Sequence, residues 1–202
     1  MMSMKQKGKK LYQPLEAYMI LYRALRSFLQ LKKAIQFGVL DEQLKERIML
    51  AVTEVNGCAM CSYAHTQMAL ESGMDHDEII AMLNGEFKDI PDDEMNAILF
   101  AQAYADQRGH PSKASKEKIM QEYGKEKTKA MMGAICVIMA GNTYGIIFGS
   151  LKGRITKQKD KVDQRSSLLY EIGMILLLIV YIPVGVIHAG IAHILHISAY
   201  PM

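Results

Sequence analysis

The residues with the clearest chemical potential are two cysteines and a histidine close together in the chain, Cys58, Cys61 and His65. Asn56-Gly57, just before them, predicts a turn that begins a helix. Residues four apart share a helix face, so Cys61 and His65 are expected to be neighbours, about 6 Å apart along the axis. A thiol at a helix N-terminus beside a histidine has a lowered pKa and forms thiolate at neutral pH. The spacing therefore indicates a redox-active pair.

Three other interpretations of the pair compete with this one. Cys58, Cys61 and His65 supply three metal ligands, but structural zinc requires four, and no second Cys/His pair follows at a suitable spacing. A purely structural disulfide would close a very short loop and would constrain the unfolded chain little. Two buried, unreactive cysteines are the third alternative. The redox interpretation is favoured, and no metal site is predicted.

A cysteine that turns over needs a route for protons, and the preceding segment supplies two carboxylates. A helix is expected over residues 41–55, apolar in its second half. Glu46 and Glu54 are eight residues apart and can share one face, so either could hydrogen-bond to His65 and hold its basic form. Each could also be an ordinary solvated glutamate. Spacing alone does not choose between the two.

The pattern Asn-Gly-Cys-x-x-Cys-x-x-x-His, with Glu46 twelve residues before the first cysteine, resembles the AhpD-like (alkylhydroperoxidase D) branch of the carboxymuconolactone decarboxylase family. The resemblance covers residues 15–150 and is sharpest over 46–66. It implies that Glu46, His65 and the two cysteines form a proton relay with a bound water. It also implies that Cys61 is the cysteine that reacts with a hydroperoxide or a partner disulfide, and that Cys58 then closes the disulfide.

The resemblance also implies partners and an assembly. These are a hydroperoxide substrate, an external dithiol reductant or redox partner protein, no cofactor, and a homo-oligomer, often a trimer or a multiple of one. The chain departs from alkylhydroperoxidase D at Met60, where that protein has a second histidine between its cysteines, so weaker activity or a different substrate is expected. The decarboxylases that name the family generally lack the cysteine pair, which argues against lactone decarboxylation.

The composition limits the other function classes. The chain has 202 residues, enough for one domain with an appendage, and only three cysteines, which fits a reducing compartment. Its net charge is +3, and its basic segments, 1–10 and 152–165, contain no interleaved aromatic residues, so nucleic-acid binding is not expected. No cleavable signal peptide is predicted, because basic side chains repeatedly interrupt the apolar positions of residues 11–39.

Helical periodicity dominates the chain, and no segment shows the alternation of a strand, so an all-α fold is predicted. Glycine, proline and capping residues set the expected boundaries. The predicted helices cover residues 14–37, 41–55, 57–72, 75–83, 91–109, 112–124, 126–151 and 167–197.

Two of these helices are strongly apolar. Residues 126–151 contain four glycines and the polar run Asn142-Thr143-Tyr144, so a buried central or interface helix is predicted, with Cys136 as a small buried residue. Residues 167–197 include sixteen consecutive uncharged positions, 172–187, and stay apolar to their end, which is long enough to span a bilayer. The alternative for this segment is a helix buried inside an oligomer.

The basic segment 151–166 precedes 167–197, and no Lys or Arg follows, so the catalytic domain is predicted to be cytoplasmic and membrane-anchored, with a simple cytoplasmic location as the alternative. His188, His193 and His196 interrupt the apolar segment, and no role is assigned to them. The expected organisation is a basic tail (1–10), an AhpD-like helical domain (11–150), a basic linker (151–166) and a membrane-anchor helix (167–197).

Three functions are weighed. The favoured hypothesis is a thiol-dependent peroxidase or disulfide oxidoreductase. The second is a membrane-tethered redox sensor or adaptor whose Cys58–Cys61 disulfide signals without turnover. The third is a non-redox enzyme of the decarboxylase type that uses His65 as a base.

Overall fold

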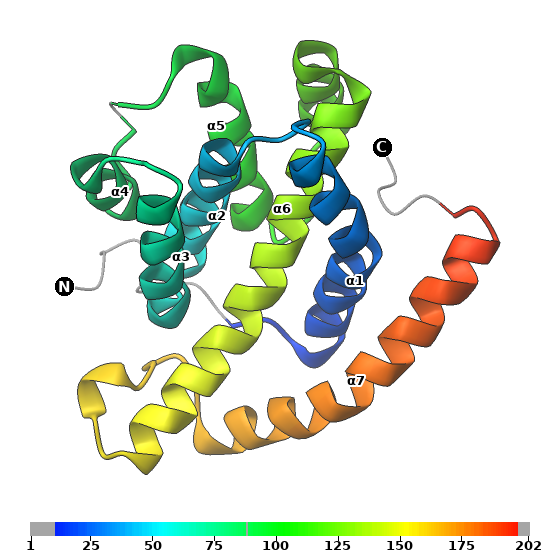
Figure 1. The fold of residues 1–202 in the computed structure, drawn as a ribbon. Coiled ribbons are helices and arrows are strands. Elements are labelled where there is room, and N and C mark those ends of the chain that lie inside the picture. The colour runs from blue at the N-terminus through cyan, green and yellow to red at the C-terminus, as the bar shows by residue number, and fades with distance from the viewer. Residues whose placement is uncertain (1–10, 88, 198–202) are drawn as a thin grey trace.

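The computed structural model describes residues 11–87 and 89–197, so the predicted basic tail at 1–10 lies outside the described residues. In this part of the chain every regular element is a helix, which confirms the predicted all-α fold (Figure 1). The elements are α1 (Pro14–Gln36), α2 (Glu42–Asn56), α3 (Ala59–Glu71), α4 (His76–Leu83), α5 (Asp92–Asp106), α6 (Lys113–Ile155), the short 3-10 helix η2 (Lys159–Lys161) and α7 (Leu168–Ile194).

Capping residues set the ends of the helices around the cysteine pair. The Asp41 side chain accepts a hydrogen bond from the amide of Leu44 at 2.8 Å and begins α2. Gly57 ends α2 with a φ of 71°, a left-handed conformation that residues with a side chain adopt only at a cost. This turn sets the direction in which α3 starts.

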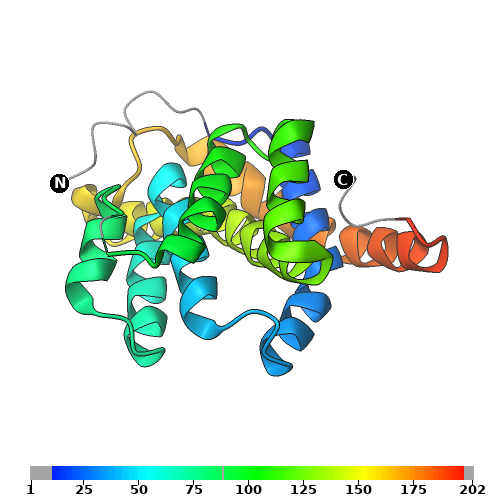
Figure 2. The ribbon, with the colours of Figure 1, turned by 90° about the horizontal axis from the view of Figure 1, so that it is seen from above.

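Helix α6 is the centre of the fold and packs against α1, α2, α3, α5 and α7 (Figures 1 and 2). Gly124 interrupts it with a φ of 73° and a ψ of 167°, at the predicted boundary between 112–124 and 126–151. In its most apolar 18-residue window, 78% of the residues are buried. The second part of α6 is therefore a core helix, as predicted.

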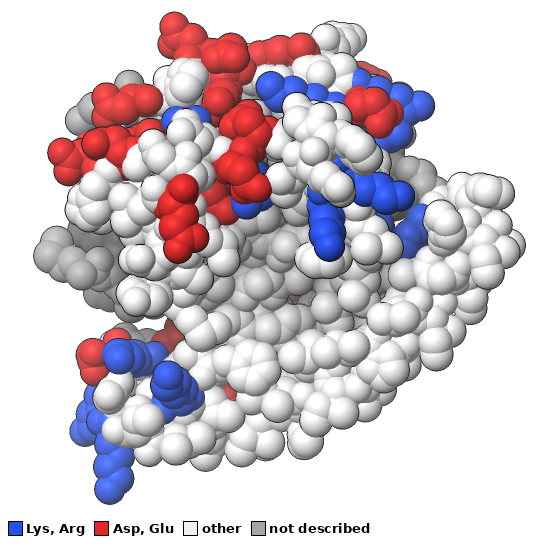
Figure 3. All heavy atoms as spheres, viewed as in Figure 1, with Lys and Arg blue, Asp and Glu red and all other residues white. Residues whose placement is uncertain are grey.

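Helix α7 is the predicted C-terminal apolar helix, and it lies along the outer side of α1 (Figures 1 and 2). The hydroxyl of Tyr18 lies 2.9 Å from His188 Nδ1, and the His188 ring stacks on Tyr22 with centroids 4.1 Å apart. A Cβ on Gly185 would lie 2.8 Å from Leu25 Cδ1, so glycine lets the two helices meet closely. Only 11% of the most apolar window of α7 is buried, and its outer face is a long uncharged surface (Figure 3).

The connection between α6 and α7, predicted to be a basic linker, has two different sides. Lys152, Lys157, Lys159 and Lys161 are exposed, and Figure 3 shows basic side chains gathered around this connection, away from the acidic end of the molecule near α4 and α5. The side chain of Arg165, by contrast, is only 13% exposed. One side of the connection therefore faces solvent, and the other packs on the helical domain.

Candidate active site

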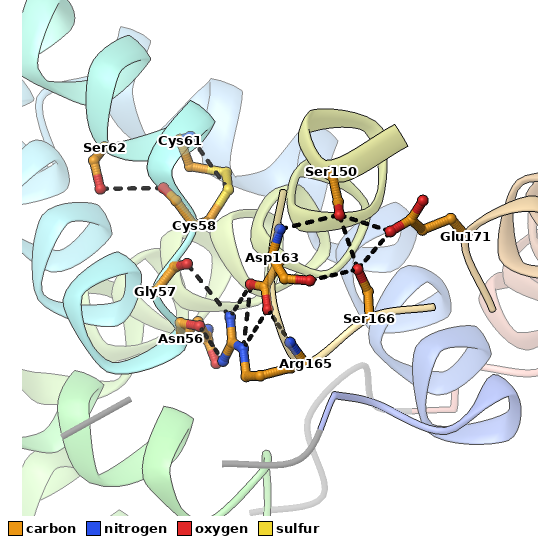
Figure 4. A network of polar contacts seen from close by, with 10 residues as sticks. All are labelled: Asn56, Gly57, Cys58, Cys61, Ser62, Ser150, Asp163, Arg165, Ser166 and Glu171. Carbon is orange, nitrogen blue, oxygen red and sulfur yellow. Dashed lines mark hydrogen bonds and ion pairs between the residues drawn. A yellow bond between two sulfur atoms is a disulfide. The ribbon is translucent and has the colours of Figure 1, made fainter. Parts of the chain in front are cut away.

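The cysteine pair lies at the start of α3, directly after the Gly57 turn. Cys58 caps the helix, because its sulfur accepts a hydrogen bond from the Cys61 amide at 3.2 Å. The two sulfurs form a disulfide whose Cα atoms are 5.2 Å apart (Figure 4). The structure thus holds the oxidised pair at a helix N-terminus, where the helix dipole favours a thiolate once the bond is reduced.

Helix α6 approaches the disulfide so closely that only glycine fits. A Cβ on Gly145 would lie 2.7 Å from Cys61 Sγ and 2.8 Å from Cys58 Sγ. Cys61 Sγ also lies 3.4 Å from the carbonyl oxygen of Gly141, which can accept a hydrogen bond from the thiol of the reduced form. Gly141 and Gly145 are one turn apart, so α6 presents a glycine face that forms one wall of the site.

The two cysteines differ in their access to solvent. Cys58 is completely buried, whereas 7% of Cys61 is exposed. Met60 lies between them and is 48% exposed, and a Cβ on Gly145 would lie 3.4 Å from Met60 Cε, so the methionine covers part of the pair. A reagent from solvent therefore meets Cys61 before Cys58.

One helical turn after Cys61, the histidine and one glutamate form a short polar chain. His65 Nδ1 lies 2.7 Å from Glu46 Oε2, and Lys45 Nζ lies 2.9 Å from Glu46 Oε1. Glu46 is completely buried, and the side chain of His65 is 14% exposed. With Nδ1–H donating to the carboxylate, neutral His65 keeps Nε2 as a free proton acceptor.

The charge state of Glu46 follows from its partners. Burial acts to raise the pKa of the Glu46 carboxyl, but the hydrogen bond from His65 and the nearby Lys45 ammonium outweigh it and hold the pKa below its ordinary value of 4.5. Glu46 is therefore a carboxylate at neutral pH. A buried carboxylate on Nδ1 fixes the orientation of the imidazole ring.

The other candidate residues lie elsewhere. Glu54, the alternative partner of His65, accepts a hydrogen bond from Gln102 Nε2 at 3.4 Å. Cys136 is buried in α6 beside Tyr104, with Sγ and the hydroxyl 3.9 Å apart, and burial raises the pKa of its thiol to about 11. The structure thus pairs Glu46 with His65, one helical turn after Cys61, and places neither Glu54 nor Cys136 in this pairing.

The histidines of the apolar C-terminal segment make contacts of another kind. His188 packs against α1 as described above, and His193 and His196 are exposed. Among residues 11–87 and 89–197, no group of three or more His, Cys, Asp or Glu side chains is arranged to hold a metal ion.

The contacts that hold the turn before the pair come from residues far away in the sequence. The Tyr12 hydroxyl donates to Asn56 Oδ1 at 2.9 Å. Arg165 Nη1 donates to the Asn56 carbonyl at 3.1 Å, as Figure 4 shows. These residues come from before α1 and after α6, and no spacing in the sequence connects them to the cysteines. The glycines of α6 were a usable signal, because glycine inside a helix often marks a close approach of another segment.

Comparison with known proteins gives one match. Residues 21–105 match the model described as the Carboxymuconolactone decarboxylase family, and the matched segment includes Glu46, His65 and both cysteines of the pair. No curated protein and no solved structure matches the chain. The wall at Gly145, the contact from Arg165 and the whole of α7 lie beyond the matched segment. Residues 21–105 of the chain are therefore similar to the carboxymuconolactone decarboxylase family.

Proposed function

We propose that the protein is a thiol-dependent peroxidase or disulfide oxidoreductase of the AhpD-like branch. The observation that carries the proposal is a Cys58–Cys61 disulfide at a helix N-terminus, one turn from a histidine that pairs with the buried Glu46 carboxylate. The family match supports it, since this family includes AhpD-like peroxidases.

The proposed reaction has two halves. His65, oriented by Glu46, takes the proton of the Cys61 thiol directly or through one water. The Cys61 thiolate attacks the terminal oxygen of a hydroperoxide, so the O–O bond breaks, an alcohol leaves and Cys61 becomes a sulfenic acid. The Cys58 thiol attacks this sulfur, water leaves and the disulfide forms. An external dithiol then returns two electrons and two protons by thiol–disulfide exchange.

The choice of Cys61 as the residue that reacts with the peroxide rests on solvent access. Cys58 is fully buried and Cys61 is not, so a peroxide or a partner thiol reaches Cys61 first. Met60 replaces the second histidine of alkylhydroperoxidase D. Without that histidine the thiolate has one source of stabilisation fewer, and we propose that the Met60 side chain instead favours an apolar peroxide. We also propose a homo-oligomeric assembly, which the family resemblance implies.

We propose that α7 associates with a membrane and that the site remains on the cytoplasmic side. The uncharged outer face of α7 and the basic side chains of the α6–α7 connection support this, because they suit acyl chains and anionic headgroups respectively. While α7 packs on α1 it can lie along a bilayer surface. Crossing the bilayer would require it to leave Tyr18 and Tyr22. Fractionation that leaves the full chain soluble would contradict membrane association.

The test is single-turnover oxidation of the reduced full chain in detergent by tert-butyl hydroperoxide, followed by intact mass. Wild type should lose two hydrogen masses within seconds. Cys61→Ser should not react, and Cys58→Ser should stop at the sulfenic acid. His65→Ala and Glu46→Gln should slow the reaction by roughly 10²-fold, the usual scale for losing a positioned base. Glu54→Gln is the matched control and should keep the wild-type rate.

Two outcomes would replace the proposal. Slow oxidation whose rate is the same in wild type, His65→Ala and Glu46→Gln favours the membrane-tethered sensor or adaptor. The family match is also compatible with a decarboxylase-type enzyme, in which His65 would act as a base on a small carbon acid. Activity of that kind would survive in the Cys58→Ser/Cys61→Ser double variant, and a thiol peroxidase would not.

The lowered pKa of Glu46 adds a prediction about stability. A carboxyl whose pKa is lower in the folded state stabilises the fold above its ordinary pKa of 4.5, and this contribution is lost as the pH falls through the lowered value. Denaturant unfolding should therefore show wild type more stable than Glu46→Gln at pH 7, with the difference in stability closing as the pH falls below 4.5. A gap that stays constant with pH would contradict the ionised pairing.

A further inference from the structure

One cation from outside the family-matched segment contacts the backbone directly before the cysteine pair. Arg165 Nη1 donates to the Asn56 carbonyl at 3.1 Å, and Nη2 lies 3.5 Å from the Gly57 carbonyl. Asn56 is the last residue of α2 and Gly57 its C-cap, so these oxygens carry the negative end of the helix dipole. Cys58 is the next residue (Figure 4).

The guanidinium is held in a fixed position. Asp163 Oδ2 accepts from Arg165 Nη2 at 2.7 Å, and Asp163 Oδ1 accepts from Nε at 3.0 Å. The Asp163 amide donates to Ser150 Oγ at 3.1 Å, and Ser150 donates to the fully buried Glu171 at 2.6 Å. Arg165 is therefore tied to α6 and to the first turn of α7 through a continuous polar network (Figure 4).

We propose that Arg165 is a positioning residue for the redox pair, acting on Cys58 through the two carbonyls of the turn. This inference rests on the proposed thiol chemistry. In the reduced state the carbonyls of Asn56 and Gly57 place negative potential next to Cys58 and disfavour its thiolate. The guanidinium offsets that potential and also fixes the turn from which α3 starts. The segment between α6 and α7 thus belongs to the site.

The directions of the thiol pKa shift in two variants separate this electrostatic role from simple support of the turn. Arg165→Gln removes the cation and should raise the apparent pKa of the reduced pair by roughly half a unit to one unit. Asp163→Asn keeps an oxygen that can accept from the guanidinium but removes its counter-charge, so the same pKa should fall. Support of the turn alone would make both variants shift in one direction, because both weaken the same contacts.

The experiment measures the rate of iodoacetamide alkylation of the reduced full chain against pH, located by peptide mass. Arg165→Lys should lie between wild type and Arg165→Gln, since an ammonium keeps the charge but not the two-pronged geometry. Lys159→Gln, which removes an exposed cation from the same connection, should leave the profile unchanged. Arg165→Gln should also change the equilibrium of the pair with dithiothreitol several-fold.

Unchanged profiles in folded Arg165→Gln, or shifts of the same sign in Arg165→Gln and Asp163→Asn, would overturn the proposal. Should Arg165→Gln fail to fold, Asp163→Asn alone decides, because only the electrostatic role lowers its thiol pKa. These measurements need no peroxide. Opposite shifts in a protein that does not reduce tert-butyl hydroperoxide would therefore uphold the role of Arg165 and reject the peroxidase.

Discussion

Helices α6 and α7 are both long and apolar enough to cross a membrane, yet their environments are opposite. In the most apolar window of α6 78% of the residues are buried, against 11% in α7. In α6, Gly133 meets Leu31 of α1 and Gly145 meets the cysteine pair, so glycines let other helices cover it. In α7, Leu176 and Ile179 point outward, 59% and 66% exposed. Length and hydropathy identify both helices, but they do not tell which of the two the other helices cover.

The largest test of this difference places a lysine in each helix. Ile135 in α6 is completely buried, so Ile135→Lys buries a charge without a partner and should cost about 5 kcal/mol or more, enough to unfold the domain. Ile179→Lys in α7 should change the free energy of unfolding by less than about 0.5 kcal/mol. It should nevertheless lower binding to phosphatidylglycerol vesicles at least tenfold. Denaturant unfolding and vesicle flotation measure the two effects.

Vesicle binding that Ile179→Lys does not change would mean that the outer face of α7 does not contact lipid. The alternative occupant is a second copy of the chain in an oligomer, and the variant would then lower the oligomer mass in sedimentation instead.

A smaller change tests the glycines. Gly145→Ala puts a methyl group within 3 Å of both sulfurs, so α3 or α6 must shift, at a cost of about 1–3 kcal/mol. Thiol titration should show that the Cys58–Cys61 disulfide forms much more slowly. In α7, no atom would lie within 4 Å of a Cβ on Gly190, so Gly190→Ala should stabilise the helix by up to about 1 kcal/mol. Equal effects of the two substitutions would contradict the proposed difference in burial between α6 and α7.

The sequence was sufficient for features that depend on local chemistry. The turn at Gly57, the cap at Asp41 and the break at Gly124 follow from residues that act within one helical turn. Predicting the hydrogen bond between Glu46 and His65 needed more than local chemistry, because helical spacing left Glu46 and Glu54 equivalent. The family resemblance favoured Glu46, and in the structure it is Glu46 that faces His65.

Contacts between distant segments could not be predicted from the sequence. Arg165 looked like one more cation of a basic linker, and nothing in its neighbours distinguishes it from Lys159 or Lys161. Its position depends on Asp163 and on Ser150 of α6, which lie near one another only after the chain has folded. Likewise, the apolar run of α7 predicted a helix, but its packing on α1 depends on Gly185 and His188 meeting particular side chains of that helix.

The junction of the two helices gives an intermediate test. Glu171 at the start of α7 is completely buried and accepts from Arg154 Nε at 3.0 Å and from Ser150 Oγ at 2.6 Å. Glu171→Gln breaks this buried pair and should cost about 1–2 kcal/mol. The matched control is Glu126→Gln in α6, whose carboxylate is 72% exposed and pairs with Lys129, and it should cost less than about 0.5 kcal/mol. Similar losses in thermal unfolding would mean that α7 is not anchored through Glu171.

The last prediction concerns no change in stability and measures only the solvent access of single thiols. Cys136 is buried in α6 and the pKa of its thiol is raised to about 11, so at pH 8 only about one molecule in a thousand carries its thiolate. It should resist iodoacetamide in the folded chain and react once urea is added. A cysteine introduced by Ile179→Cys into α7 should react at once in the vesicle-free protein and become protected on vesicles. Rapid alkylation of Cys136 without urea would show that the core around α6 opens readily, and the contrast with α7 would then be one of degree.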